Sequence, residues 1–302
     1  MDGVLVIDKP AGLTSHDVVN RVRRILHERS VGHLGTLDPL ATGVLPLVAG
    51  RMTRLAQFYT ASEKTYEGSI RFGFATDTYD ADGEPLEAPH VLNATLEELK
   101  EIALNFQGRI SQMPPPFSAK KIHGVPAYKL ARKKREVDLQ PVEVEIKEFE
   151  LLDWDGEQAR FRARVASGTY MRAVAHDMGH LVGCGAHLAS LRRTGVGEFG
   201  LSDAQTLEKL EVACQQGYTE EIFIHPRKLL PQMPSVTANE ETLARIRVGR
   251  AVNLPEMSRS RQVKVFHGQS ELIAIATRVA GTLFHPGIVL VGEAQPTGSR
   301  AG

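Results

Sequence analysis

The spacing of hydrophobic and polar residues predicts a chain of mixed strands and helices. Short apolar or alternating runs predict strands over 3–8, 44–49, 64–74, 141–152, 158–166 and 188–193. Apolar residues at helical spacing predict a helix that starts near Thr14 or Ser15, and further helices over 51–59, 95–106, 169–182 and 239–247. The helix at 95 also has a capping box, formed by Thr95 and Glu98.

Two breaks in this pattern organise the chain. Residues 31–43 hold three glycines, a proline and one acid, which predicts a loop. The prolines of 225–234 mark a boundary near 232, after which strand patterns dominate. We therefore expect a domain of residues 1–231 and a small β-rich, barrel-like domain of residues 232–302.

Composition and charge limit the classes of function. The chain has 302 residues, two cysteines and a formal net charge of zero. Two cysteines cannot build a disulfide framework, and no apolar run is long enough to span a membrane. We expect a cytoplasmic protein that binds RNA only through local patches. The sharpest patch is 118–135, with seven basic residues and no acid.

Several residues have side chains suited to catalysis, but each also has a plainer interpretation. Asp38 is the only acid of the 31–43 loop and suits a nucleophile or base, or a turn-forming aspartate. Arg172 suits a carboxylate clamp or an ordinary surface arginine, and Tyr66 suits a stacking residue or a half-buried strand residue. His176 and His180 share a helix face, which suits a metal site or, as we favour, two solvent-facing histidines. Phosphate-binding loops, dinucleotide fingerprints and the zinc-deaminase pattern are all absent from the sequence.

Beyond these single residues, the chain contains one long loop motif and six supporting motifs. GHLGTLDPLATGVLP (32–46) closely resembles the signature loop of the bacterial tRNA pseudouridine-55 synthases, the TruB family. The supporting motifs in family order are GVLVIDKPAGLTSHDVV, KTYEG, ATDTYDADGEP, PPPFSAKKIHGVPAYKLAR, SGTYMRAVAHDMG and GCGAHLASLRRTGVGEF. The resemblance covers residues 3–200 and implies an α+β fold with a mainly antiparallel mixed sheet. The C-terminal segment resembles a PUA-like RNA-binding barrel.

The resemblance implies isomerisation of uridine 55 in the T-loop of tRNA, with no cofactor and no metal. Asp38 would be the nucleophile that attacks the flipped uridine, at C6 of the base or at C1′ of the ribose. The matching substrate-binding residues are His33, Tyr66, Asp80, Tyr170, Arg172 and Leu191. In the basic stretch, the residues expected to grip the RNA backbone are Lys120, Lys121, Lys129, Arg132 and Lys133.

The same resemblance implies a monomer whose only required partner is the T-arm of tRNA. It leaves two alternatives open. One is a guide-RNA-dependent pseudouridine synthase, which shares the loop but works with partner proteins. The other is a tRNA-folding chaperone that acts by binding alone.

Overall fold

A large mixed sheet followed by a smaller one forms the frame of the protein. The computed structural model describes residues 1–117, 121–122, 125–126 and 139–292. Along the large sheet the strands are β12 (Ala204–Gln205), β1 (Gly3–Lys9), β3 (Thr42–Ala49), β10 (Ala186–Val196), β4 (Lys64–Phe72), β9 (Gln158–Val165), β8 (Val142–Trp154) and β5 (Gly108–Gln112). Two short strands attach beside this path, β2 (Val31–His33) on β3 and β11 (Phe199–Gly200) on β10. Most neighbours are antiparallel, and the pairs β1–β12 and β3–β10 are parallel, so the expected α+β class with a mainly antiparallel mixed sheet is confirmed.

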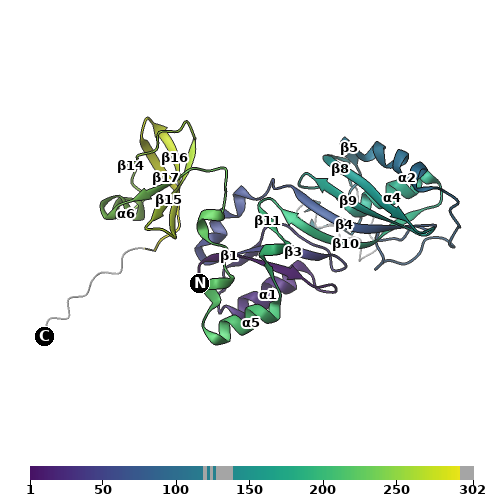
Figure 1. Cartoon of the computed structure of the whole chain (residues 1–302), viewed down its shortest axis with the longest axis horizontal. Coiled ribbons are helices and arrows are strands. Elements are labelled where there is room, and N and C mark those ends of the chain that lie inside the picture. Colours follow the sequence, from purple (N-terminus) through teal and green to yellow (C-terminus); the bar gives the residue numbers. More distant parts are fainter. Residues whose placement is uncertain (118–120, 123–124, 127–138, 293–302) are drawn as a thin grey trace.

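Helices cover one face of this sheet in two groups. In Figure 1, α1 (Ser15–Ile25) and α5 (Leu207–Gln216) lie below β1 and β3, while α2 (Leu96–Ala103) and α4 (Met171–Val182) lie at the far end of the sheet. Residues of all four helices share one buried core with the strands. Burying the apolar stripes of these helices is the main stabilising term. The groups therefore bracket the middle of the sheet, where β3, β10 and β4 meet.

Local signals in the sequence explain several element boundaries. Thr14 caps α1, accepting a hydrogen bond from the backbone N–H of Asp17 at 3.0 Å, and Asp17 completes the capping box. The predicted box at Thr95 and Glu98 likewise starts α2. Helix α4 ends at Gly183, whose φ of +83° is the left-handed conformation typical of a helix end.

Three expectations are corrected by the structure. Residues 31–33 are not loop, because Val31–His33 pair with β3 as strand β2 and leave a loop of residues 34–41. The segment predicted as a helix over 51–59 is the 3₁₀ helix η1 (Gly50–Phe58). The strand expected over 188–193 extends over all of β10, and β5 and α5 were not anticipated. The remaining 3₁₀ turns are η2 (Leu104–Phe106), η3 (Leu201–Asp203), η4 (Thr219–Ile222) and η5 (Pro226–Lys228).

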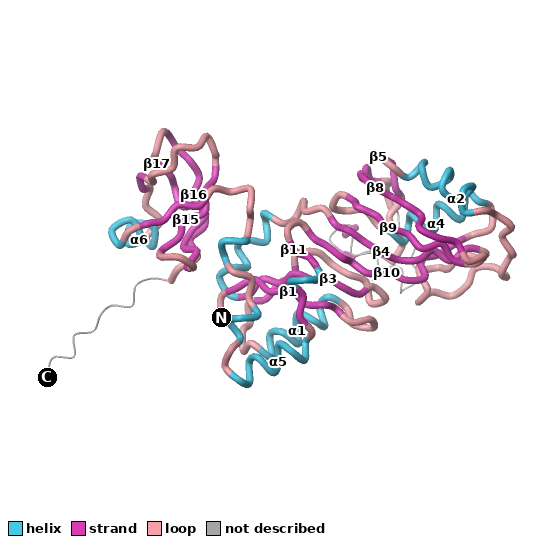
Figure 2. Tube along the Cα trace, viewed as in Figure 1, coloured by secondary structure: helices cyan, strands magenta, loops and turns pink. Residues whose placement is uncertain are grey.

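The C-terminal part is a five-stranded sheet with one helix. Its strand order is β13 (Ser235–Ala238), β15 (Gln262–His267), β16 (Glu271–Ala280), β17 (Leu283–Val289) and β14 (Val252–Asn253), with α6 (Glu240–Arg247) packed beside it. Figure 2 shows this sheet at one end of an elongated molecule. Two further short strands, β6 (Lys121–Ile122) and β7 (Val125–Pro126), pair antiparallel with each other.

The two sheets share a hydrophobic core. Val4 and Val6 of β1 belong to the same buried cluster as Phe266 of β15 and Ile275 of β16, and Leu230 of the connecting segment is part of it. The guanidinium of Arg54 in η1 also donates to the carbonyl of Val289 at 2.6 Å. The C-terminal sheet is therefore packed onto the back of the large sheet.

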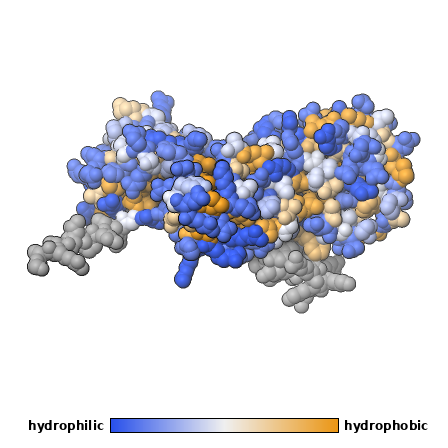
Figure 3. All heavy atoms as spheres, turned by 60° about the horizontal axis from the view of Figure 1, so that its bottom comes forward, coloured by the Kyte–Doolittle hydropathy of each residue, from blue (hydrophilic) through white to orange (hydrophobic). Residues whose placement is uncertain are grey.

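The face of the protein shown in Figure 3 is mainly hydrophilic, and its apolar residues form separate patches. Among the described residues, no helix is long and apolar enough to cross a membrane.

Candidate active site

A buried arginine holds the loop that carries Asp38. Arg193 of β10 is fully buried, and its guanidinium donates to the carbonyls of Gly35 at 3.0 Å, Thr36 at 3.1 Å and Val44 at 2.8 Å. Burial lowers the pKa of Arg193, whereas Tyr66 and Asp38 beside it raise it. A guanidinium remains charged across the physiological range, so these bonds are charge-assisted and hold the loop firmly.

Lys9 and Ser15 hold the other side of the same loop. The ammonium of Lys9, which is also fully buried, donates to the carbonyls of Pro10 at 2.9 Å, Leu13 at 2.6 Å and Pro39 at 3.3 Å. Burial lowers the pKa of Lys9 to about 8, against the opposing effect of the nearby carboxylate of Asp38. The hydroxyl of Ser15 exchanges hydrogen bonds with the backbone of Leu37, at 2.7 and 2.9 Å. The backbone on both sides of Asp38 is therefore fixed before any substrate arrives.

Asp38 faces a guanidinium from the far helix group. Arg172, near the start of α4, places Nε 2.9 Å from Oδ2 of Asp38, and the two side chains are 5% and 38% exposed. The contact is an ion pair by distance, because the N–H of Nε is not directed at the oxygen as in a hydrogen bond. The pair brings together two residues 134 positions apart.

Arg172 is itself fixed by three other acceptors. Its Nη1 donates to the carbonyl of Thr78 at 3.1 Å and lies 3.5 Å from Oδ2 of Asp80, and its Nη2 donates to the carbonyl of Phe117 at 3.0 Å. Asp80 is buried and accepts a hydrogen bond from the hydroxyl of Thr78 at 2.6 Å. The guanidinium therefore cannot turn away from Asp38 without breaking these contacts.

The other expected substrate-binding residues come from strands β2, β4 and β10 and from the residue before α4. Tyr66 of β4 stands opposite Arg193 in the sheet and is 8% exposed. Leu191 of β10 is partly buried against the same core. His33 of β2 is half-buried, its Nδ1 accepts from the N–H of Gly35 at 3.3 Å, and burial lowers its pKa. Tyr170 precedes α4, where its backbone exchanges hydrogen bonds with the side chain of Gln112.

Other expected residues are not placed, or are placed differently. Lys120, Lys129, Arg132 and Lys133 lie outside the described residues, and of Lys121 only the backbone in β6 is described. The sequence favoured two solvent-facing histidines at 176 and 180. His180 is exposed, but His176 is half-buried because its ring packs against Tyr79. Within the described part of the chain, no group of three or more His, Cys, Asp or Glu residues is placed to hold a metal.

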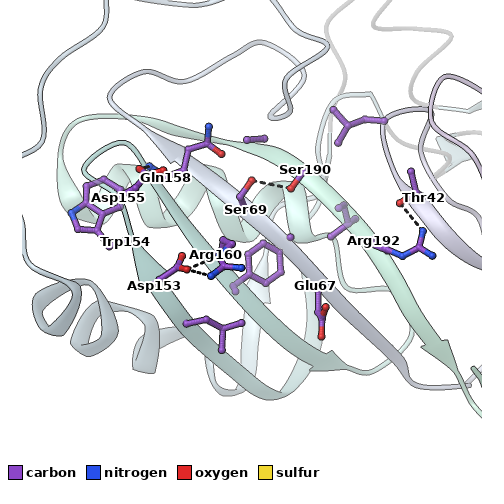
Figure 4. A pocket seen from close by; sticks show the side chains of 16 residues that line it. Thr42, Glu67, Ser69, Asp153, Trp154, Asp155, Gln158, Arg160, Ser190 and Arg192 are labelled. Carbon is purple, nitrogen blue, oxygen red and sulfur yellow. Dashed lines mark hydrogen bonds and ion pairs between the residues drawn. The ribbon is translucent and has the colours of Figure 1, made fainter. Parts of the chain in front are cut away.

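A hollow of about 750 Å³ lies on the opposite face of the sheet. Figure 4 shows Glu67, Ser69 and Arg160 among its lining residues, and because strand side chains alternate, Glu67 points away from the face of Tyr66. Its charges are largely paired, as in Arg160 with Asp153 and Arg192 with Asp8. Asp38 and Arg172 do not line this hollow, whereas Leu191 does.

The site offers one partly exposed carboxylate held by buried cations. A carboxylate in such a frame can attack an electrophilic carbon or remove a proton without moving the loop. Sequence reasoning missed Lys9 and Arg193. Their signal was a cation at the end of a strongly apolar strand, at Lys9 after GVLVID and at Arg193 in LASLRR.

Comparisons with known proteins agree with this geometry. Residues 23–171 match the model of the TruB family pseudouridylate synthase N-terminal domain, and residues 172–236 match the tRNA pseudouridylate synthase B C-terminal domain. The chain is 50% identical to the tRNA pseudouridine synthase B of Solibacter usitatus, covering 96% of this chain and all of that one. It is 40% identical to the protein of that name from Bacillus cereus, covering 91% and 92%.

Solved structures show the same fold. The chain superimposes on a chain of the crystal structure of a Cbf5-Nop10-Gar1 complex with a TM-score of 0.71 and 25% identity, covering 96% of this chain and 85% of that one. A chain of an H/ACA RNP bound to a substrate RNA containing 2′-deoxyuridine gives a TM-score of 0.70 at 23% identity, covering 97% and 86%.

Proposed function

The chain belongs to the TruB family of pseudouridylate synthases, and on that premise we propose how its residues convert uridine to pseudouridine in tRNA. It is an isomerase that acts on uridine 55 of the T-loop. The glycosidic bond between N1 and C1′ breaks, a bond between C5 and C1′ forms, the proton at C5 is lost and N1 gains one. The reaction is balanced without an oxidant, a reductant or a second substrate.

The observation that carries the proposal is the fixed, partly exposed carboxylate of Asp38. Arg172 holds one of its oxygens at 2.9 Å, and the loop bonds of Arg193 and Lys9 fix its backbone. A carboxylate can form a covalent bond to the nucleotide and leave again, as an isomerisation requires. We propose that Asp38 is this nucleophile, with attack at C6 or at C1′.

The remaining residues shape the space around the flipped base. We propose that Tyr66 packs on the base and takes part in removal of the C5 proton, and that Leu191 supplies an apolar contact. Arg172 positions Asp38, and Asp80 positions Arg172. Flipping a base costs a few kcal/mol, and stacking on an aromatic ring returns about 1–3 kcal/mol.

Two further residues complete the proposed substrate site. His33, whose pKa is lowered by burial, stays neutral and helps to fill the place the base has left. Tyr170, on the turn before α4, contacts the nucleotide. The basic stretch 118–135 grips the RNA backbone through Lys120, Lys121, Lys129, Arg132 and Lys133.

At the level of the whole chain, we propose a catalytic domain of residues 1–231 and a PUA-like RNA-binding domain of residues 232–302. The enzyme acts as a monomer in the cytoplasm and needs no partner protein. The similarity to a Cbf5 chain keeps a guide-dependent enzyme as the second candidate, but relatives at 40–50% identity over nearly the whole chain favour the stand-alone enzyme.

The first experiment compares wild type with Asp38→Asn on an unmodified tRNA transcript. Pseudouridine is read by carbodiimide treatment and primer extension, and tRNA binding is measured on the same samples. We expect product at uridine 55 with wild type only and binding with both proteins. Glu101→Gln removes an exposed carboxylate from α2 and serves as the matched control, with wild-type turnover expected.

The outcomes separate the candidates. Binding without product from wild type indicates a missing guide or partner, or a chaperone that acts by binding alone. Wild-type turnover by Asp38→Asn would remove Asp38 from the role of nucleophile while leaving the activity itself in place.

A further inference from the structure

A stack of aromatic rings lies beside Arg172. His176 follows Arg172 by one turn of α4, and its ring lies parallel to that of Tyr79, with 3.7 Å between centroids and 8° between planes. His180, one turn further on, meets His176 edge-on, with 4.9 Å between centroids. The stack therefore joins α4 to the segment of residues 76–82, which supplies two of the acceptors of Arg172.

The backbone at Tyr79 has an uncommon conformation. Its φ is +67°, the left-handed region that a bulky side chain rarely adopts. Tyr79 separates Thr78, whose carbonyl accepts from Arg172, and Asp80, whose carboxylate lies 3.5 Å from it. The left-handed turn allows both groups to face one guanidinium. Such a conformation persists only where the surroundings hold it.

Two kinds of contact hold Tyr79 in this conformation. Its backbone N–H donates to the carbonyl of Thr76 at 3.2 Å, and its carbonyl accepts from the N–H of Leu188 in β10 at 3.0 Å. The second contact is the stack itself, which connects the ring of Tyr79 to α4. The backbone bonds anchor the segment to the sheet, and the stack anchors it to the helix that carries Arg172.

The imidazole of His176 contributes an uncharged planar ring to the stack. Its Nδ1 is buried and has no hydrogen-bond partner among the described residues, so packing and not hydrogen bonding at that atom holds the ring. Burial and the neighbouring His180 lower the pKa of His176 to about 4, which keeps the imidazole uncharged at neutral pH. Asp177 faces Tyr79 and raises the pKa of its hydroxyl, after the larger effect of burial.

We propose that Tyr79 and His176 are positioning residues for the isomerisation. Their stack clamps residues 76–82 against α4, which keeps Thr78 and Asp80 on Arg172 and keeps Nε of Arg172 on Asp38. Neither residue touches the reacting atoms. The inference rests on the function proposed above, since it concerns the geometry of the same carboxylate.

The test separates rate from affinity and stacking from simple bulk. Tyr79→Phe and His176→Phe keep a flat ring, whereas Tyr79→Leu and His176→Ala remove the stack. With enzyme saturating, we expect the single-turnover rate of the Phe variants to stay within threefold of wild type. The rate of the Leu and Ala variants should fall by roughly 10- to 100-fold, as expected when a catalytic group is misplaced by about 1 Å. The Kd for tRNA should change by less than threefold in all four.

A glycine variant keeps the test valid if Tyr79→Leu unfolds the protein. Glycine adopts positive φ without strain, so Tyr79→Gly removes the ring and leaves the turn easy to form. We expect it to melt near the wild-type temperature and to react as slowly as Tyr79→Leu. Leu181→Ala, an exposed change on the same helix, is the matched control with an unchanged rate.

The two proposals fail in different ways. If wild type forms no pseudouridine at uridine 55, the proposed function fails before any variant is compared. If wild type is active and Tyr79→Gly and His176→Ala react at its rate, the stack has no positioning role. Equal losses in the Phe and Leu variants would also overturn the inference, because they would assign the effect to the lost polar atoms.

Discussion

Replacing Arg193 by methionine tests whether a buried cation holds the catalytic loop. Methionine keeps much of the volume of Arg193 but removes the donors that reach Gly35, Thr36 and Val44. The buried carbonyl of Val44 and the part-buried carbonyls of Gly35 and Thr36 lose a charged partner. At about 1–3 kcal/mol for each group left unsatisfied, less where water reaches it, the total cost is about 3–5 kcal/mol. At an unfolding entropy of roughly 2.1 cal/mol/K per residue, this corresponds to a fall in Tm of about 5–8 °C for a chain of 302 residues.

The neighbouring arginine supplies the control. Arg192 pairs with Asp8 at 2.8 Å, but the two side chains are 41% and 32% exposed. An exposed pair contributes only about 0–1 kcal/mol, so Arg192→Met should lower Tm by less than about 2 °C. Both variants are melted under circular dichroism and assayed for single-turnover pseudouridine formation.

The two arginine variants should differ in both stability and rate. Arg193→Met should be the less stable variant and should also lose rate while still folded, because the loop that carries Asp38 is released. If Arg193→Met melts no lower than Arg192→Met, the bonds from Arg193 to the loop do not have the importance given to them here.

Other measurements follow from the same structure. Arg172→Ala and Tyr66→Ala should reduce turnover far more than tRNA affinity, and equal losses in both quantities would contradict their roles. Burial lowers the folded-state pKa of His176 to about 4 and also lowers that of His187, so the unfolded chain binds more protons below pH 6.5. The contribution of these histidines to the free energy of unfolding should therefore be complete above pH 6.5 and fall towards pH 4. For the half-buried His176 the loss at pH 5 is on the order of 1 kcal/mol. A melting temperature that rises on acidification would refute this. Activity should be unchanged in a metal chelator, whereas a chelator-sensitive enzyme would revive a metal role for the histidines. The logarithm of tRNA affinity should fall with the logarithm of salt with a slope no steeper than about −5, which is the value if all seven cations of 118–135 meet phosphates of a single strand.

The sequence predicted those elements whose signals are local. The cap expected at Thr14 or Ser15 and the capping box predicted at Thr95 placed two helix starts correctly, because a cap and its partner lie within three residues of each other. Strand β2 escaped prediction because its three residues, Val31–His33, include a glycine and are stabilised by pairing with β3. That pairing is tertiary and leaves no periodic trace in so short a segment.

The residues of the candidate site also differ in how far the sequence could predict them. The loop motif singled out Asp38, but only the folded chain brings Arg172 to it across 134 positions. Lys9 and Arg193 were hidden because their function is to bind carbonyl oxygens of the backbone, which every residue has. The stack of Tyr79 on His176 was likewise invisible, since the two rings come from distant segments and the pattern H-D-x-x-H favoured two solvent-facing histidines.

The core shared by the two sheets has a mechanical consequence. Phe266 and Ile275 of the C-terminal sheet are buried together with Val4 and Val6 of the large sheet. The two parts therefore do not move independently, as domains joined by a flexible linker would. The distance from the C-terminal sheet to Asp38 is therefore set by the packing of the protein. An RNA that touches both ends must match this distance.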